Sequence, residues 1–246
     1  MKRCIEWAKL TWPEASDIVA KHPVAILPLG AIEEHGPHMR LESDNRAAVE
    51  FSTRLATESG CVLLPLLPYG QVWSLKNFPG SLTIGNETLV AVITDICHSL
   101  AEKGFRGVVG VTCHLGNLNS LKLAARKLHD SGDVPLLSLF YPGLSEIASK
   151  VCQSKRSHHG IIHADEIETS LLLELAPDCV EMSKAAPEYP DFPPGFDEQA
   201  LPWDLVSRTG VFGDPTKATR EKGKIMIDEV IAKALALIEA FRANAK

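Results

Sequence analysis

Four short runs of apolar residues constrain the fold of this chain more than any other feature of its sequence. These runs are Val24–Leu29, 61–67, Gly107–Thr112 and 134–139. None of them alternates polar and apolar side chains, as a strand with one face in water would. Each run is therefore predicted to be a strand buried on both faces, and such strands belong to parallel sheets covered by helices.

The segments between these strands have the periodicity of helices. Residues 86–103 place Leu89, Ile93 and Leu100 on one apolar stripe, with Asn86 as the expected N-cap. Further helices are predicted over residues 44–57, 119–128, 165–175 and 217–242. This alternation predicts an α/β fold, a three-layer helix/sheet/helix sandwich around a mostly parallel sheet.

The length and charge of the chain exclude several classes of protein. Its 246 residues correspond to one large domain, or at most two small ones. With 25 Lys and Arg against 31 Asp and Glu, the formal net charge is −6, and no basic cluster offers the positive surface that nucleic acids need. No apolar run reaches the ~18 residues of a membrane span. The N-terminal residues lack the apolar core of a secretory signal, so we expect a cytoplasmic protein that binds neither nucleic acid nor membrane.

Residues 187–215 interrupt the alternation of strands and helices. They contain six prolines, with aromatic residues such as Phe192, Phe196 and Trp203 between them. Long irregular segments in compact domains are often lids, binding loops or interface arms. The alternative is a rigid crossing over the surface without a functional role.

Carboxylates and imidazoles follow the predicted strands at the points where the strands end. Glu33 and His35 come after the first long strand, and His114 comes after the strand Gly107–Thr112. Asp44 and Glu168 lie near the starts of two predicted helices. Ligands of doubly wound sheets bind outside the carboxyl ends of the strands, so these side chains are expected to meet there.

Two imidazoles and three carboxylates form a donor set that suits Zn²⁺, Mn²⁺ or Fe²⁺. The six cysteines form no CxxC pair, which predicts buried reduced thiols rather than a zinc–thiolate site. Five ligands fit two cations that share one carboxylate and one water, with Asp44 as the candidate bridge. Two alternatives stay open: each histidine could be a hydrogen-bonded core residue, and Glu34 could replace Glu33 as the inward carboxylate.

Six motifs in order along the chain resemble those of the creatininase (creatinine amidohydrolase) family. Residues 33–38 (EEHGPH) followed by Asp44 resemble its E-x-H-G-P-H…D signature. The other five are residues 68–70 (PYG), 78–81 (FPGS), 114–117 (HLGN), 163–170 (HADEIETS) and 210–216 (GVFGDPT).

The resemblance implies a single creatininase-like metallohydrolase domain over residues 1–246, assembled as a homohexamer, with two divalent metal ions per chain. One ion would be held by Glu33, Asp44 and His114. The other would be held by His35, Asp44 and Glu168. This ligand set agrees with the donor set obtained from the strand ends.

Departures from the family pattern bear on the substrate. The creatinine-hydrolysing branch has a glutamate at the position of Gly116, and the family often has Glu-His where Ser74 and Leu75 stand. The tryptophans that cover creatinine have no clear counterpart, because Trp73 and Trp203 lie elsewhere in the sequence. Other family members deformylate amino-pyrimidine nucleotides, trim peptide-derived cofactor precursors or open oxidised inositol rings.

The expected chemistry is hydrolysis of an amide-like carbonyl, in a cyclic amide or formamide of a small polar molecule. Bound cations lower the pKa of water from ~15.7 toward ~7, which makes hydroxide available at neutral pH. His163, just before the helix that carries Glu168, is the candidate general acid/base. His38, Ser81, Asn117 and Trp73 are candidate substrate-binding residues, with Asn119 as a further possible donor. The alternatives are hydrolytic ring opening of an oxidised inositol and a catalytically inactive metal-binding protein.

Overall fold

The computed structural model describes residues 3–244 and contains one parallel sheet. Its strand order is β1-β3-β2-β4-β5, and every neighbouring pair is parallel. The strands are β1 Ile5–Glu6, β2 Val24–Leu29, β3 Val62–Leu63, β4 Gly107–Thr112 and β5 Leu136–Leu139. The central strands β2 and β4 are buried along their whole length, as the unbroken apolar runs predicted.

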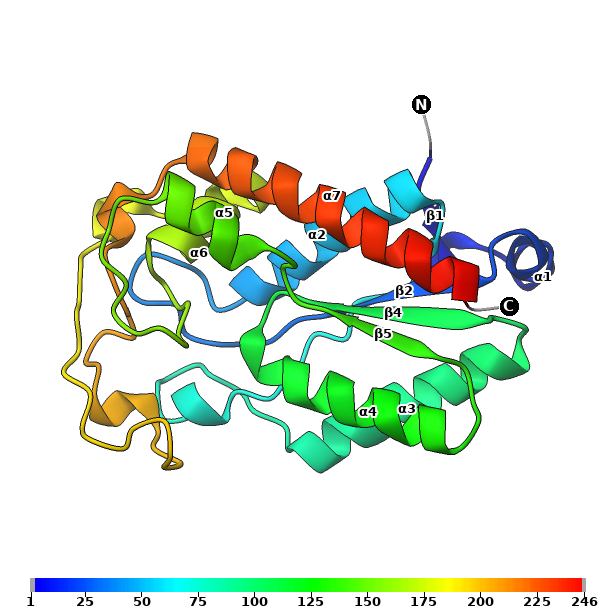
Figure 1. Ribbon diagram of the computed structural model, residues 1–246, viewed down its shortest axis with the longest axis horizontal. Helices are drawn as coiled ribbons and strands as arrows, with labels where there is room; N and C mark the ends of the chain where they lie inside the picture. Colours follow the sequence, from blue (N-terminus) through cyan, green and yellow to red (C-terminus); the bar gives the residue numbers. More distant parts are fainter. Residues whose placement is uncertain (1–2, 245–246) are drawn as a thin grey trace.

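Helices cover both faces of the sheet, so the predicted three-layer sandwich is confirmed (Figure 1). One layer consists of α2 Ser43–Ser59, α5 Leu144–Val151, α6 Glu166–Leu175 and α7 Arg220–Asn244. The opposite layer consists of α3 Asn86–Glu102 and α4 Leu118–Asp130, and the short helix α1 Trp12–Lys21 lies at the other end of the molecule from α5 and α6.

The side chains on the two faces of the sheet belong to two separate apolar cores, because successive strand residues point to opposite sides. Ile26 of β2 packs toward α2 and α7, in a cluster with Phe51 and Ile227. Its neighbour Leu27 packs toward α3 and α4, in a cluster with Leu89. This double burial fixes the register of the sheet and therefore the position of its carboxyl edge.

Several predicted boundaries differ from the observed ones for local reasons. Residues 61–67 shorten to β3, because Pro65 has no N–H to give to the strand ladder. The run 134–139 becomes a strand only after Pro135. Asn86 is the first residue of α3 rather than its cap, which is Gly85. The last helix begins at Arg220 because Pro215–Lys217 forms a separate 3₁₀ turn.

Three elements had not been predicted: the two-residue strand β1, α1 and α5. Helix α1 begins with a capping box, in which the Thr11 side chain and the Glu14 side chain each accept a backbone N–H of the other residue. That Thr-x-x-Glu pattern is visible in the sequence.

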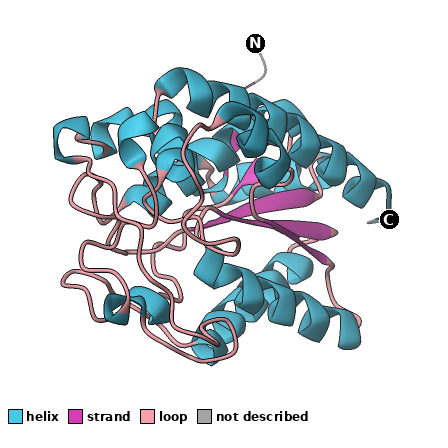
Figure 2. Cartoon of the chain, turned by 60° about the vertical axis from the view of Figure 1, so that its left-hand side comes forward, coloured by secondary structure: helices cyan, strands magenta, loops and turns pink. Residues whose placement is uncertain are grey.

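The loops at the carboxyl ends of the strands gather at one end of the molecule (Figure 2). Residues 187–215, yellow to orange in Figure 1, form an extended crossing there. Its ends are joined by a bridge between Glu188 and Gly213. Phe192 and Trp203 of this segment pack in a third apolar cluster that also contains Ala31, from the loop after β2. The segment is thus fastened over the carboxyl edge of the sheet. No helix within residues 3–244 is both long and apolar enough to cross a membrane.

Candidate metal centre

Five side chains converge at the carboxyl edge of the sheet, and we call them the ligand cluster. Two follow β2, one follows β4, one lies in the first turn of α2 and one in the first turn of α6. All are buried, with at most 8% of each residue exposed. The cluster comprises Glu33, His35, Asp44, His114 and Glu168.

Local structure presents the two helical ligands at helix N-termini, where backbone N–H groups and the helix dipole favour carboxylates. Asp44 is the second residue of α2. At α6, the N-cap Asp165 accepts the N–H of Glu168 at 2.9 Å. The Glu168 carboxylate in turn accepts the N–H of Ala164 at 2.6 Å, which holds it toward the cluster.

The ligand cluster divides into two groups of three that share Asp44. In the first group, Nδ1 of His114 lies 3.1 Å from Glu33 Oε2 and 3.2 Å from Asp44 Oδ2. In the second, Nε2 of His35 lies 3.5 Å from Asp44 Oδ1 and 3.7 Å from Glu168 Oε1. Each group places one donor atom per residue within 4.8 Å of the others, which is close enough to surround a single cation.

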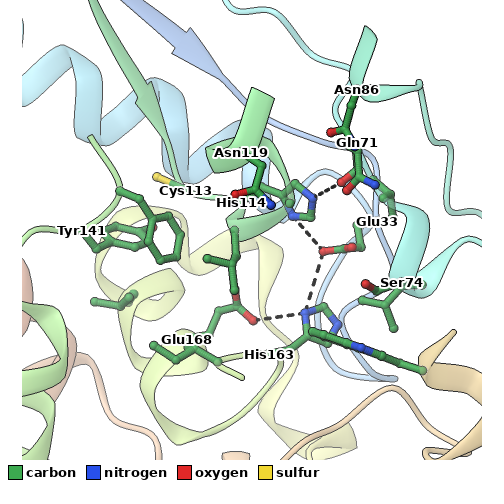
Figure 3. A pocket seen from close by; sticks show the side chains of 18 residues that line it. Glu33, Gln71, Ser74, Asn86, Cys113, His114, Asn119, Tyr141, His163 and Glu168 are labelled. Carbon is green, nitrogen blue, oxygen red and sulfur yellow. Dashed lines mark hydrogen bonds and ion pairs between the residues drawn. The ribbon is translucent and has the colours of Figure 1, made fainter. Parts of the chain in front are cut away.

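Backbone contacts fix which nitrogen of each imidazole faces the carboxylates. Nε2 of His114 donates to the carbonyl oxygen of Gln71 at 2.7 Å (Figure 3). The neutral ring therefore presents the lone pair of Nδ1 to Glu33 and Asp44. Nδ1 of His35 is 3.1 Å from the carbonyl oxygen of Glu33, which leaves its Nε2 lone pair toward Asp44 and Glu168. Outer hydrogen bonds of this kind orient metal-ligating histidines.

Two buried polar atoms of the cluster lack hydrogen-bond partners within residues 3–244, and bound cations would provide the missing interactions. His35 Nε2 and Asp44 Oδ2 are buried without a hydrogen-bond partner among the described residues. Lone pairs facing carboxylate oxygens repel each other unless a proton or a cation lies between them. Nitrogen and oxygen donors without a thiolate suit Zn²⁺ or Mn²⁺, so the residues present fit two such ions.

Without cations, protons take over this role, and the pKa values of the cluster shift accordingly. Burial lowers the pKa of His114, but the carboxylates of Glu33 and Asp44 outweigh it and raise the pKa well above its ordinary value. His35 shows the same balance, with Asp44 and Glu168 as the carboxylates. Burial raises the pKa of Asp44, but His35 and His114 outweigh it and hold the pKa well below its ordinary value.

His163 lies beside the ligand cluster: it belongs to neither group that shares Asp44, but its donor atom lies within 4.8 Å of donor atoms of Glu33 and His35. Its Nδ1 is 3.8 Å from Glu33 Oε2 and 3.8 Å from Glu168 Oε2 (Figure 3). Its Nε2 is 3.2 Å from Oε1 of Glu34, so Glu33 and Glu34 face different partners. Glu33 is therefore the inward carboxylate, while Glu34 is buried behind the histidine.

A pocket of about 280 Å³ opens onto the cluster, and its wall is largely uncharged. Among the described residues that line it, six have ionisable side chains. These are Glu33, His114, His163 and Glu168, together with Cys113 and Tyr141. Burial raises the pKa values of both Cys113 and Tyr141 above their ordinary values, which keeps them neutral. The rest of the wall combines apolar side chains with five residues that we call the pocket rim: Gln71, Ser74, Asn86, Asn119 and Trp203.

Of the candidate substrate-binding residues, Asn119 lines this pocket, whereas His38, Ser81, Asn117 and Trp73 lie outside its lining. Asn117 donates to the carbonyl oxygen of Gly30 and accepts the N–H of Gln71, so it joins β2 to the rim loop. His38 contacts the Thr169 hydroxyl at 2.9 Å, and burial lowers its pKa to about 4. Ser81 accepts the N–H of Glu34. Trp73 lines a neighbouring pocket.

The rim contains residues that sequence reasoning missed. Trp203, from the segment 187–215, lines the pocket and stacks edge-on against His163, with ring centroids 6.0 Å apart. Gln71 had no predicted role, and Asn86 was predicted only as a helix N-cap. At Gly116 an added Cβ would lie 2.2 Å from the Gln71 carbonyl oxygen and 2.4 Å from His114 Nε2, so the loop is shaped around the absence of a side chain.

Fold and site together define a hydrolase with a three-layer α/β architecture and a buried imidazole–carboxylate centre. The family model described as creatininase, creatinine amidohydrolase, matches residues 8–238, and the chain belongs to this family. Creatinine amidohydrolase of Pseudomonas putida is 28% identical over 243 residues, which cover 93% of this chain and 94% of the relative.

Other relatives act on different substrates. The mycofactocin precursor peptide peptidase of Mycobacterium ulcerans is 29% identical over 231 residues, covering 88% of this chain and 85% of the relative. The 3-dehydro-scyllo-inosose hydrolase of Thermotoga maritima is 22% identical over 245 residues, covering 90% and 78%. A solved structure named "Creatininase Mn" superposes with a TM-score of 0.84 at 27% identity, covering 97% of this chain and 98% of the other.

Proposed function

We propose that the protein is a dinuclear metal-dependent hydrolase that attacks an amide-like carbonyl of a small polar molecule with activated water. The observation that carries this proposal is the pair of buried ligand groups that share Asp44. Glu33, Asp44 and His114 would hold one ion, and His35, Asp44 and Glu168 the other. Divalent cations bound there, Zn²⁺, Mn²⁺ or Fe²⁺, would lower the pKa of water and polarise the substrate carbonyl.

His163 is the proposed general acid/base. It is buried, it lines the pocket, and its Nδ1 faces the space between Glu33 and Glu168. From there it is placed to accept a proton from the attacking water and to pass it to the leaving atom. The apolar wall beside it, which includes Trp203, excludes bulk water and strengthens the electrostatic interactions within the site.

The pocket rim favours an uncharged substrate. Gln71, Asn86 and Asn119 present carboxamides to the pocket, and none of its lining residues is a lysine or arginine that would bind a phosphate. Asn86 accepts the Ser120 hydroxyl through Oδ1, which leaves its amide N–H groups to the pocket. Carboxamides both donate and accept, so they suit neutral groups such as amides and hydroxyls.

This rim also supports a second candidate function, the hydrolytic ring opening of an oxidised inositol. Such a substrate is a neutral ring rich in hydroxyl groups, and the three carboxamides offer it hydrogen bonds of both kinds. The relative from Thermotoga maritima carries the corresponding name. Cyclic amides release an amine and formamides release formate, whereas the cyclic diketone releases an open-chain keto acid without nitrogen.

The test combines metal analysis with a hydrolysis screen. The purified protein is measured for bound metal by elemental analysis, then offered small cyclic amides, formamides and inosose derivatives before and after chelation. Two metal ions per chain with chelator-sensitive turnover support the proposal. Protein that binds no metal on reconstitution, or turnover that survives chelation, contradicts it.

We further propose a homo-oligomer, a hexamer by resemblance to the family. Light scattering of the eluting protein measures its mass directly, and a monomer at all concentrations contradicts this proposal.

A further inference from the structure

Glu34 follows a cluster ligand in the chain but has a separate set of partners. Its side chain is 8% exposed, and Oε1 lies 3.2 Å from His163 Nε2. Its other oxygen, Oε2, accepts the N–H of Gly36 at 2.9 Å. Both carboxylate oxygens are thereby occupied away from the ligand cluster.

The surrounding backbone is built around this carboxylate. The N–H of Glu34 donates to the Ser81 hydroxyl at 3.1 Å, which turns the residue away from Glu33. Gly210 lies against the carboxylate, and a Cβ added there would come 2.0 Å from Glu34 Oε2. Its φ of +74° also favours glycine. Segments distant in sequence therefore meet to hold the Glu34 carboxylate in one place.

This contact decides the tautomer of His163. A carboxylate only accepts hydrogen bonds, so the neighbouring Nε2 must carry the proton. Nδ1 of the neutral ring then presents its lone pair to the cluster, where it lies 3.8 Å from both Glu33 Oε2 and Glu168 Oε2. The nitrogen that faces the reaction space is thus the one left able to accept a proton.

We propose that Glu34 is a positioning residue that holds His163 in its Nε2–H tautomer, so that Nδ1 exchanges the proton of the hydrolytic reaction. The attacking water loses its proton to Nδ1 as its oxygen bonds to the carbonyl carbon. Glu34 stabilises the resulting imidazolium, which carries a proton on each nitrogen. Nδ1 then returns the proton to the leaving atom as its bond to the carbonyl carbon breaks. This inference rests on the general acid/base role proposed for His163.

Glu34→Gln tests the proposal because Gly36 dictates how the carboxamide must sit. The N–H of Gly36 requires an oxygen opposite it, so the amide NH₂ would face His163 and demand a lone pair on Nε2. The variant should therefore hold the opposite tautomer. We expect kcat to fall by about 10²–10⁴-fold on the best-hydrolysed compound of the screen, with KM and metal content unchanged.

Glu174→Gln is the matched control. The Glu174 side chain is 9% exposed, almost the same as that of Glu34, and it pairs with Arg54 and Arg220 instead of an imidazole. Loss of its charge should lower the melting temperature and leave kcat unchanged. An equal loss of kcat in both variants would reduce the role of Glu34 to general structural support and overturn the proposal.

The tautomer itself is measured by ¹⁵N NMR of the His163 imidazole in Zn²⁺-loaded protein at alkaline pH. The wild-type chain should show a protonated Nε2, and Glu34→Gln a protonated Nδ1. A wild-type ring protonated on Nδ1 would overturn the proposal even if the variant failed to fold. If the wild-type protein hydrolysed nothing, the proposed function would fail, while this measurement would still decide what Glu34 does.

Discussion

The ligand cluster and the pocket rim lie on one pocket but are built on opposite principles. The cluster is buried and charged; three of its side chains come from the loops after β2 and β4, and two from the first turns of α2 and α6. The rim is partly exposed and uncharged, and most of its residues come from loops and helix starts. The two regions therefore differ in burial and charge rather than in the kind of element that carries them.

This division suggests why one family hydrolyses unrelated compounds. In the proposed function the cluster sets the reaction, and its geometry is expected to tolerate little change because its charges are buried together. The side chains of the rim are proposed to select the bound molecule and are expected to tolerate substitution without loss of the cluster. The two regions are therefore expected to respond differently to substitution.

The largest effect is expected from Asp44→Ala, in the cluster. One carboxylate serves both groups, so its removal should abolish both cation positions and lower activity by more than ~100-fold, the upper range for losing an outer-shell partner alone. Elemental analysis should find less than one ion per chain. Retention of two ions by the variant would contradict the proposal that Asp44 is a ligand of both cations.

His163→Ala should separate chemistry from metal binding. The side chain lies beside the cluster and belongs to neither group that shares Asp44. We expect both ions to remain while kcat falls by ~10²–10⁴-fold. Steady-state kinetics with parallel metal analysis provide the measurement, and a fully active variant would remove His163 from proton transfer.

Asp165→Asn should reveal the cost of burying the Asp165 carboxylate beside the cluster. Burial raises the pKa of Asp165 to about 7, so in chelated protein the folded state resists its ionisation. Below pH ~4 the residue is neutral in both the folded and the unfolded chain, so its ionisation makes no difference between the free energies of unfolding of the variant and the wild type. Between pH ~4 and ~7 ionisation favours the unfolded wild-type chain, so the variant gains relative stability, and above that range the gain is constant.

Asparagine is as good an N-cap as aspartate, so the cap of α6 itself should survive this substitution. Thermal unfolding of both proteins at several pH values, in the presence of a chelator, follows the difference. A melting-temperature difference between the two proteins that does not change with pH would contradict the raised pKa of Asp165 in the folded chain.

Asn119→Ala, in the rim, should have the smallest effect. Loss of one hydrogen bond to a neutral substrate costs ~0.5–1.5 kcal/mol, which corresponds to a rise in KM of roughly 2- to 10-fold. Metal content and melting temperature should not change, in contrast to the cluster variants. A loss of bound metal would show that rim and cluster are not separable.

Much of the fold and of the cluster was predictable because the patterns that specify them are local in the sequence. β2 and β4 were predicted with their observed ends, since runs without charged residues or polar–apolar alternation are typical of buried strands. The five cluster residues were predicted because they follow strands or open helices, and parallel strands bring such positions to one edge.

The rest depends on contacts between distant segments. The opposite orientations of Glu33 and Glu34 require Ser81 and Gly210, which no local pattern connects to them. Trp203 reaches the pocket only because the segment 187–215 packs across the carboxyl edge of the sheet. Helix α1 was different, since its Thr11 and Glu14 capping pattern was present in the sequence and was overlooked.

We propose that the cluster holds two cations that share Asp44, and anomalous scattering from crystals of the Mn²⁺- or Zn²⁺-loaded protein tests this proposal most directly. Two metal peaks per chain are expected, one among Glu33, Asp44 and His114 and the other among His35, Asp44 and Glu168. A single peak, or a cluster closed by direct hydrogen bonds with no peak at all, would contradict it.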